Sequence, residues 1–308
     1  MSSIRHSAFG IRHFLFLMLA LPIVPAALAQ AAEAVAPDLR LEYALRAWTG
    51  ARALGRTVGS VTMEFSNEKL DGQPTRVLRV RIQASFLTIR INALSESFMT
   101  PDLNRELLFH YIRTGGEQTE SKLVFGPTEV DYHKLVHCDA GEACKNPDHQ
   151  VASPLHFLNG RTCHCSGCNR AEHCEWRVLC HHPSNPPVCD MFAAVYLARA
   201  EGMTVGGPAR TTRCAADLKL WDVAFRPVER ETVTVPAGTF DTVRVELSPT
   251  PANAHAAAEE FRGPFGMGPD TKMWIEPDQR LLVKLTGTAH MGIAPQTEMN
   301  LVRVTKAP

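Results

Sequence analysis

The chain has 308 residues, of which 21% are charged, and its 32 basic side chains are balanced by 32 acidic ones. This balance argues against nucleic acid as a partner, because proteins that bind nucleic acid usually carry a basic stripe. The length suffices for one large β domain or two smaller domains.

The N-terminal residues have the three parts of a secretion signal in order. Arg5 and Arg12 supply the positive start, an apolar run extends from Phe14 to Val24, and Ala27-Leu28-Ala29 provides a small-x-small cleavage pattern. The apolar run is shorter than the roughly 20 residues that span a bilayer. We therefore expect a signal peptide over residues 1–29 and an exported protein of the periplasm or cell envelope. After cleavage it would not be an integral membrane protein, and 30 basic would face 32 acidic side chains, a net charge of −2.

Short strands are predicted from Leu41 onward. Over residues 76–84, the apolar Leu78, Val80 and Ile82 alternate with polar neighbours such as Arg79 and Arg81. Alternation with a period of two is typical of a strand with one buried face. The same pattern, punctuated by Gly and Pro turns, predicts further strands around 61–65 and over 88–93, 106–113, 120–125 and 129–135.

The periodicity stops between about His137 and Cys189. Eight of the nine cysteines lie in this segment, and only Cys214 lies outside it. We expect residues 137–189 to form a loop-like, cysteine-rich insertion that is held together by cross-links in place of a hydrophobic core.

One helix is predicted in the rest of the chain, over Asp190–Ala200. Asp190 can cap its first turn by accepting a backbone N–H bond, Phe192 and Tyr196 share one face, and Gly202 is placed to end it. Strands then resume over 217–225, 231–235, 239–247, 272–275, 281–288 and 296–304, with a loop at 252–268 that carries one helical turn at 256–261.

About a dozen short strands joined mostly by short turns predict a mainly β fold, a large antiparallel meander with one short helix. Because strand twist accumulates and open edges are a hazard, we expect the sheet to curl into a barrel or half-barrel. The first half of this domain would span residues 30–136, and the helix with the second half 190–308. A curled sheet of this size either fills its interior or encloses a ligand cavity, and the pattern does not choose between the two.

Four stretches resemble an exported bacterial domain-of-unknown-function family, numbered three-one-zero-eight. They are Leu41-Glu42-Tyr43 with the turn and strand that follow, Asp190–Arg199, Glu231–Val245 and Met273–Leu285. The third is the most specific, because Pro236 and Gly238 favour a tight reversal between two strands. The resemblance implies a barrel or half-barrel in the periplasm or envelope and no particular enzyme activity. The cysteine-rich insertion departs from the family's pattern.

The cysteine cluster favours disulfide bonds, because an exported protein meets no cytosolic reductant. Eight cysteines can form four disulfides in 105 pairings, and the sequence does not select one. Cys214 is then either a free buried thiol or a partner for one cysteine of the insertion. The disulfide candidates are Cys138, Cys144, Cys163, Cys165, Cys168, Cys174, Cys180 and Cys189.

Part of the same cluster suggests a metal site as an alternative. Thiolates and imidazoles suit zinc or cuprous copper. A zinc ribbon needs a second Cys-x2-Cys pair, however, and the chain has only one. That pair also suggests thiol oxidoreductase chemistry, although the usual βαβ setting is missing. The metal candidates are Cys163, Cys165, Cys168, His173 and Cys174.

The chain lacks the common catalytic motifs, such as Gly-x-Ser-x-Gly, His-Glu-x2-His or a phosphate-binding glycine loop. We therefore expect a non-enzymatic envelope protein without a cofactor, in a binding or structural role, whose curved sheet holds an apolar ligand such as a lipid or lipid-linked glycan. The alternatives are a zinc- or copper-binding envelope protein and a thiol oxidoreductase or unrecognised hydrolase.

Overall fold

The computed structural model describes residues 39–48, 55–86, 89–114, 119–137, 174–184, 187–200, 203–216, 218–252, 258–289 and 295–306. They form one fifteen-stranded sheet with one α-helix and two short 3-10 turns. The predicted signal peptide, residues 1–29, lies outside the described residues, and so do Gly202 and most of the predicted insertion. Among the described residues, no helix is both long enough and apolar enough to cross a membrane.

The first eight strands follow one another along the chain and across the sheet. They are β1 (Leu39–Trp48), β2 (Arg56–Leu70), β3 (Gln73–Phe86), β4 (Ile89–Met99), β5 (Glu106–Thr114), β6 (Thr119–Phe125), β7 (Glu129–His137) and β8 (Cys174–Pro183). Together, β2 to β8 form what we call the N-terminal arm of the sheet.

The remaining strands form the C-terminal arm, β9 to β14, and the last strand, β15. Their bounds are β9 (Val188–Asp190), β10 (Arg210–Ala216), β11 (Lys219–Val235), β12 (Gly238–Pro251), β13 (Lys272–Glu276), β14 (Leu281–Thr288) and β15 (Gln296–Lys306). The helix α2 (Met191–Ala200) follows β9, and the turns η4 (Ala258–Glu260) and η5 (Pro264–Gly266) lie between β12 and β13.

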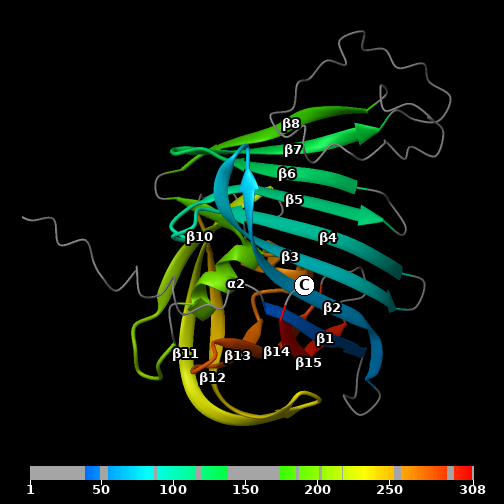
Figure 1. Cartoon of the computed structure of the whole chain (residues 1–308), viewed down its shortest axis with the longest axis vertical. Coiled ribbons are helices and arrows are strands. Elements are labelled where there is room, and N and C mark those ends of the chain that lie inside the picture. The colour runs from blue at the N-terminus through cyan, green and yellow to red at the C-terminus, as the bar shows by residue number, and fades with distance from the viewer. Residues whose placement is uncertain are drawn as a thin grey trace, which may run out of the picture.

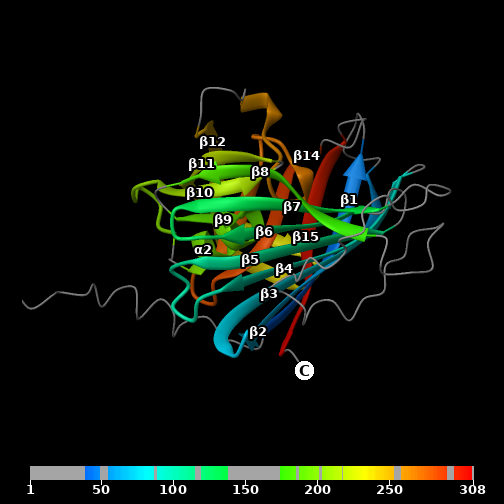
Figure 2. The ribbon, with the colours of Figure 1, turned by 90° about the horizontal axis from the view of Figure 1, so that it is seen from above.

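The two arms meet where β1 pairs with β15, so the first and last strands lie in the middle of the sheet. All neighbouring strands are antiparallel except β9 and β10. The two edge strands are consecutive along the chain: β8 ends at Pro183 and β9 begins at Val188. Five residue steps span at most about 18 Å, so the sheet must curl to bring its edges together. Figures 1 and 2 show this curl, which confirms the predicted meander folded into a half-barrel.

Alternating burial along the strands separates an inner from an outer face. In β1, Leu41, Tyr43, Leu45 and Ala47 are buried and face inward, whereas the residues between them are half-buried. This is the period-two pattern that predicted most strands.

Two features of the sheet differ from the sequence predictions. The strands predicted over 217–225 and 231–235 are one long strand, β11, because a bulge between Pro227 and Glu229 absorbs the interruption. The strands β8 and β9 lie in the stretch without periodicity. β8 is an edge strand, and its Val178 and Leu179 are both exposed, so its sequence has no buried face to mark it.

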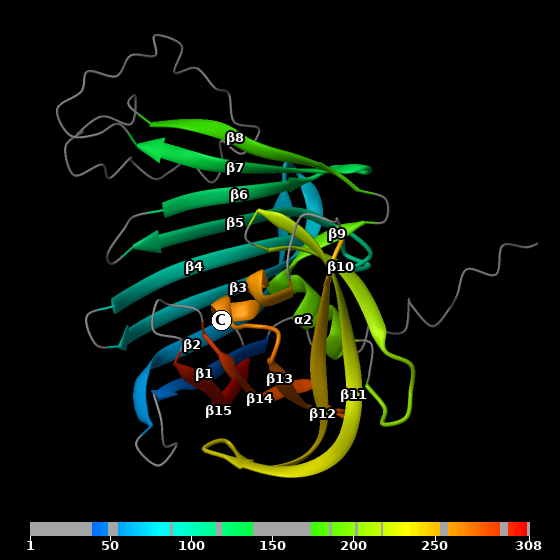
Figure 3. The ribbon, with the colours of Figure 1, turned by 180° about the vertical axis from the view of Figure 1, so that it is seen from behind.

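The helix α2 lies in the concavity of the sheet, as Figures 1 and 3 show. Asp190 caps it as predicted: its Oδ1 accepts hydrogen bonds from the backbone N–H groups of Phe192 (2.5 Å) and Ala193 (3.2 Å). Further along the helix, the Tyr196 ring stacks on Phe65 of β2 at 4.8 Å between centroids. The helix thus fills part of the space inside the curled sheet and leaves the rest as a cavity.

Candidate functional site

A cavity of about 480 Å³ lies inside the curled sheet. Its volume falls in the range of small-molecule pockets, which is roughly 300–1,000 Å³. One wall comes from the inner faces of β1 to β7, and the other from β10, the N-terminal turn of α2 and the segment around η5. Most of the side chains that line it are apolar, including Leu45, Val58, Ile82, Ile91, Phe109, Leu123, Met191, Phe192 and Phe265.

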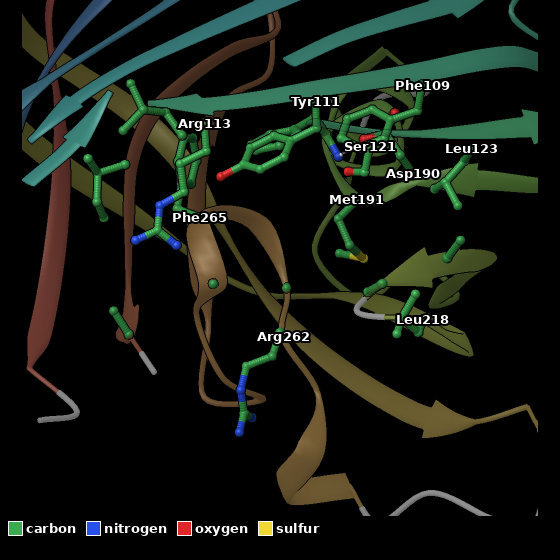
Figure 4. A pocket seen from close by; sticks show the side chains of 18 of the residues that line it. Phe109, Tyr111, Arg113, Ser121, Leu123, Asp190, Met191, Leu218, Arg262 and Phe265 are labelled. Carbon is green, nitrogen blue, oxygen red and sulfur yellow. Dashed lines mark hydrogen bonds between the residues drawn. The ribbon is translucent and has the colours of Figure 1, made fainter. Parts of the chain in front are cut away.

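Strand β5 supplies three neighbouring groups of the first wall. Because side chains alternate along a strand, Phe109, Tyr111 and Arg113 all face the cavity, and Figure 4 shows the three side by side. The rings of Phe109 and Tyr111 are stacked, with 6.4 Å between their centroids. The intervening His110 and Ile112 are buried on the opposite face.

Aromatic side chains separate the cavity from the packed interior. Phe192 of α2 contacts Phe265 of η5 edge-to-face at 5.2 Å and lies 6.4 Å from the ring of Phe109. The backbone of Phe265 is left-handed, with φ of 59°, and Gly266 continues the turn with φ of 70°. A left-handed aromatic residue costs of order 1–3 kcal/mol, which the surrounding contacts must offset. The turn thereby places the Phe265 ring in the wall of the cavity.

Arg113 is a half-buried polar group of the cavity that the protein leaves partly unsatisfied. Its Nε atom is buried and has no hydrogen-bond partner, and no ion pair joins Arg113 to the described residues. The two other cations behave differently. Lys219 pairs with Glu260, and Nη1 of Arg262 donates to the carbonyl oxygens of Glu259 (2.7 Å) and Phe261 (2.9 Å).

Asp190 is the carboxylate that lines the cavity, and its oxygens are already engaged by the protein. Besides capping α2, it accepts a hydrogen bond from the Ser97 hydroxyl at 2.5 Å. Its own backbone N–H donates to Oε2 of Glu106, also at 2.5 Å. Burial and the neighbouring Asp190 charge raise the pKa of Glu106 well above its usual range. The hydrogen bond from the Asp190 backbone to Glu106 anchors the start of α2 to β5.

The structure brings together Cys214 and one cysteine of the predicted insertion, Cys189. Cys189 on β9 and Cys214 on β10 are register partners, and both are buried free thiols. The Cys214 thiol beside Cys189, together with burial, raises the pKa of Cys189 well above its usual range. Cys180 on β8 is a half-buried free thiol.

The predicted cysteine-rich sites lie mostly outside the described residues. Of the five metal candidates, Cys174 lies in β8, and Cys163, Cys165, Cys168 and His173 are not described; the same holds for the disulfide candidates Cys138 and Cys144. The described part of the chain holds no cluster of three or more His, Cys, Asp or Glu side chains suited to a metal ion. The zinc and copper hypotheses therefore stay predictions, and so does disulfide pairing outside the described residues, whereas the described candidates Cys180 and Cys189 are free thiols.

Residues 180–294 match the family model described as "Protein of unknown function (DUF3108)". This match confirms the predicted resemblance over the C-terminal arm, which contains three of the four stretches that carried it. No curated protein sequence matches the chain.

Solved structures with similar folds share little sequence with this chain. A β-barrel-like protein of the unknown-function family DUF1849 from Brucella abortus is 8% identical, covers 89% of this chain and 99% of its own, and has a TM-score of 0.45. A proposed lipoprotein from Parabacteroides distasonis is 9% identical over 88% and 96%, with a TM-score of 0.29. A proposed exported protein with a YmcC-like fold from Bacteroides fragilis is 10% identical over 88% and 97%, with a TM-score of 0.30. None of these descriptions names an enzymatic activity or a ligand.

Proposed function

We propose that this chain, whose residues 180–294 match a family of unknown function, is an exported, non-enzymatic binding protein of the cell envelope. Its site is the cavity inside the curled sheet, and its ligand is apolar over most of its length, such as the acyl chain of a lipid or a lipid-linked glycan. The observation that carries the proposal is a cavity of about 480 Å³ with a mainly apolar lining.

The chemistry of the lining favours an apolar ligand over water. A buried water needs two to four polar partners, and most of the side chains that line the cavity, such as Leu45, Ile82 and Leu123, offer none. An apolar ligand that displaces the remaining solvent gains roughly 25 cal/mol for each Å² of apolar surface that it buries. A single acyl chain suits this arrangement, because it supplies a long apolar surface with one polar end.

The polar groups of the cavity support binding better than catalysis. His182, which lines the cavity, places its Nε2 atom 2.8 Å from the carbonyl oxygen of Leu218. A carbonyl oxygen can only accept a hydrogen bond. The Nε2 atom of His182 therefore carries the hydrogen in this contact and cannot act as a general base. Asp190 is engaged with Ser97 and the start of α2, as described above. The predicted signal peptide supports the location in the envelope.

A matched pair of substitutions on β3 tests the proposal. Ala84 lines the cavity, whereas its neighbour Gln83 is exposed on the outer face. Ala84→Phe should block the cavity, and Gln83→Phe adds the same ring outside it. The probe is N-phenyl-1-naphthylamine, a neutral dye that fluoresces when it enters an apolar site.

We expect saturable binding of the dye at micromolar concentration to the parent protein and to Gln83→Phe, with at least a tenfold loss in Ala84→Phe. Urea unfolding of all three proteins identifies any variant that has lost its fold. Failure of the parent protein to bind the dye, or equal binding by a folded Ala84→Phe, would overturn the proposal.

A further inference from the structure

We infer that the cavity recognises an amphipathic anion, and that Arg113 holds the oxyanion of this ligand, a carboxylate or phosphate at the end of an acyl chain. The inference rests on the proposed function, because it concerns the polar end of a ligand in the same cavity. It is carried by the position and the unsatisfied state of one arginine.

Arg113 is half-buried, and a guanidinium nitrogen that is buried without a hydrogen-bond partner is costly. Burial of a charged or polar group without a hydrogen bond destabilises a protein, and arginine cannot avoid this cost by losing its proton. Arg113 keeps its Nε atom buried and unpaired while it lines the cavity. A ligand oxyanion would supply the missing acceptor, because guanidinium binds carboxylate and phosphate groups with two parallel hydrogen bonds.

Tyr111 supplies a second donor beside Arg113. The two side chains share one face of β5, and Figure 4 shows the Tyr111 hydroxyl pointing toward Arg113. Within the described part of the chain, this hydroxyl makes no hydrogen bond. Burial raises the pKa of Tyr111 from its ordinary value of 10, against the opposing charge of Arg113, so the hydroxyl stays protonated at neutral pH. Both groups therefore present hydrogen-bond donors to the same part of the cavity.

The other charged groups of the cavity favour an anion as well. Lys219 and Arg262 add two cationic side chains to the lining, and Arg262 is satisfied by backbone carbonyls alone in the described structure. The carboxylate that lines the cavity, Asp190, is occupied by its hydrogen bonds to α2 and Ser97. A cationic ligand would therefore meet Arg113 and Arg262, a Lys219 that is paired with Glu260, and a carboxylate that is already engaged.

Competition between ligands that differ only in their polar end tests this inference. The parent protein is loaded with N-phenyl-1-naphthylamine at pH 8, where a carboxylic acid is ionised, and the dye is displaced by palmitate or by hexadecan-1-ol. Charge-assisted hydrogen bonds predict that palmitate displaces the dye at an approximately tenfold lower concentration than the alcohol.

Variants of Arg113 then assign this preference to its side chain. Arg113→Met should bring the ratio of the two displacing concentrations close to one, and Arg113→Lys should keep part of the preference. The matched control is Arg81→Met, which removes an exposed arginine from the outer face of β3 and should keep the tenfold preference.

Two further competitors identify the source of the oxyanion. If hexadecyl phosphate displaces the dye at the same concentration as palmitate, the site also accepts phosphate head groups, which supports the inference. Inorganic phosphate is then added at 10 mM. If it weakens palmitate binding to the parent protein but not to Arg113→Met, Arg113 also binds free oxyanions. An absence of competition by inorganic phosphate ties recognition of the anion to the acyl chain.

The proposed function and this inference fail in different ways. If the dye does not bind at all, the proposed function fails. If the dye binds but palmitate has no advantage over hexadecan-1-ol, or if Arg113→Met keeps the full advantage, the inference alone is overturned.

Discussion

The two ends of the sheet's inner face have the same alternating sequence pattern and opposite states of packing. At the packed end, around α2 and the C-terminal arm, Tyr43, Phe65, Trp221 and Phe225 are at most 5% exposed. At the open end, around β4 to β7, inward-facing aromatic side chains such as Tyr111 are only partly buried and line the cavity. Alternation therefore specifies which residues share a face, and the segments placed opposite that face decide whether it borders a core or a cavity.

Polar groups at the two ends differ in the same way. The buried Tyr43 hydroxyl at the packed end donates to the carbonyl oxygen of Leu282 at 2.9 Å. The buried Arg199 guanidinium there also has an Nε atom without a hydrogen-bond partner, but aromatic rings cover it: it lies 4.6 Å from the ring of Phe65 and 5.1 Å from that of Tyr196. At the open end, Arg113 Nε has no partner. Buried polar groups that have hydrogen-bond partners or are covered by aromatic rings are typical of a packed core. A polar group that borders a cavity and lacks a hydrogen-bond partner is typical of a ligand site.

Truncation of one large aromatic residue at each end should give the largest difference. Trp221 is fully buried, and its ring packs edge-to-face on Phe261 at 5.3 Å. We expect Trp221→Ala to lower the free energy of unfolding by about 3–5 kcal/mol, because it leaves a void in a packed core. Phe109→Ala at the open end should cost at most about half as much, since one side of Phe109 already faces the cavity. Urea unfolding curves measure both, and equal losses would contradict the difference in packing.

Enlargement of one alanine at each end is the converse change. Ala194 on α2 has no exposed surface, whereas Ala84 on β3 borders the cavity. Overpacking predicts that Ala194→Leu lowers the free energy of unfolding by about 1–3 kcal/mol. Ala84→Leu has free volume in front of it and should change stability by less than about 0.5 kcal/mol. The account of the open end is wrong if Ala84→Leu is as destabilising as Ala194→Leu.

A smaller, pH-dependent effect is expected at Glu106, where the two ends meet. Because burial and Asp190 raise its pKa in the folded state, folded Glu106 holds its proton to a higher pH than the unfolded chain does. Its contribution is fully present below the unfolded pKa of about 4.3 and is lost as the pH rises through the folded pKa. Glu106→Gln cannot ionise, so the variant should gain stability relative to the parent protein as the pH rises from 5 to 8.

Urea unfolding at pH 5, 6.5 and 8 gives the free energy of unfolding of each protein, and thus how steeply it changes with pH. The exposed Glu259→Gln on η4 serves as the matched control for the loss of one carboxylate. If the free energies of unfolding of Glu106→Gln and the parent protein change with pH in parallel, Glu106 has the same pKa in the folded and the unfolded state, which contradicts the prediction.

Much of the fold was predictable, because its strands alternate and its helix has a recognisable cap. The strand predicted over 281–288 matches β14, and Asp190 caps α2 as expected. Edge strand β8 was missed because it has exposed apolar residues on both faces. Local patterns also do not reveal that a bulge joins two predicted segments into β11.

The candidate site was less predictable than the fold. The sequence allowed either a filled or a hollow interior, since alternation does not show what lies opposite a strand. One signal for the site was present: Arg113 shares a strand face with Phe109 and Tyr111, where a charged residue is unusual. The opposite face of β5, with Leu108 and Ile112, is equally apolar, so this signal could not say which face is inside.

Native mass spectrometry of the protein isolated from its own cell envelope shows whether the open end holds a ligand. We expect one bound small molecule per chain, an acyl-chain anion, in the parent protein and in Gln83→Phe, and its loss in Ala84→Phe. All three proteins at the mass of the bare chain, with organic extracts free of lipid, would contradict it.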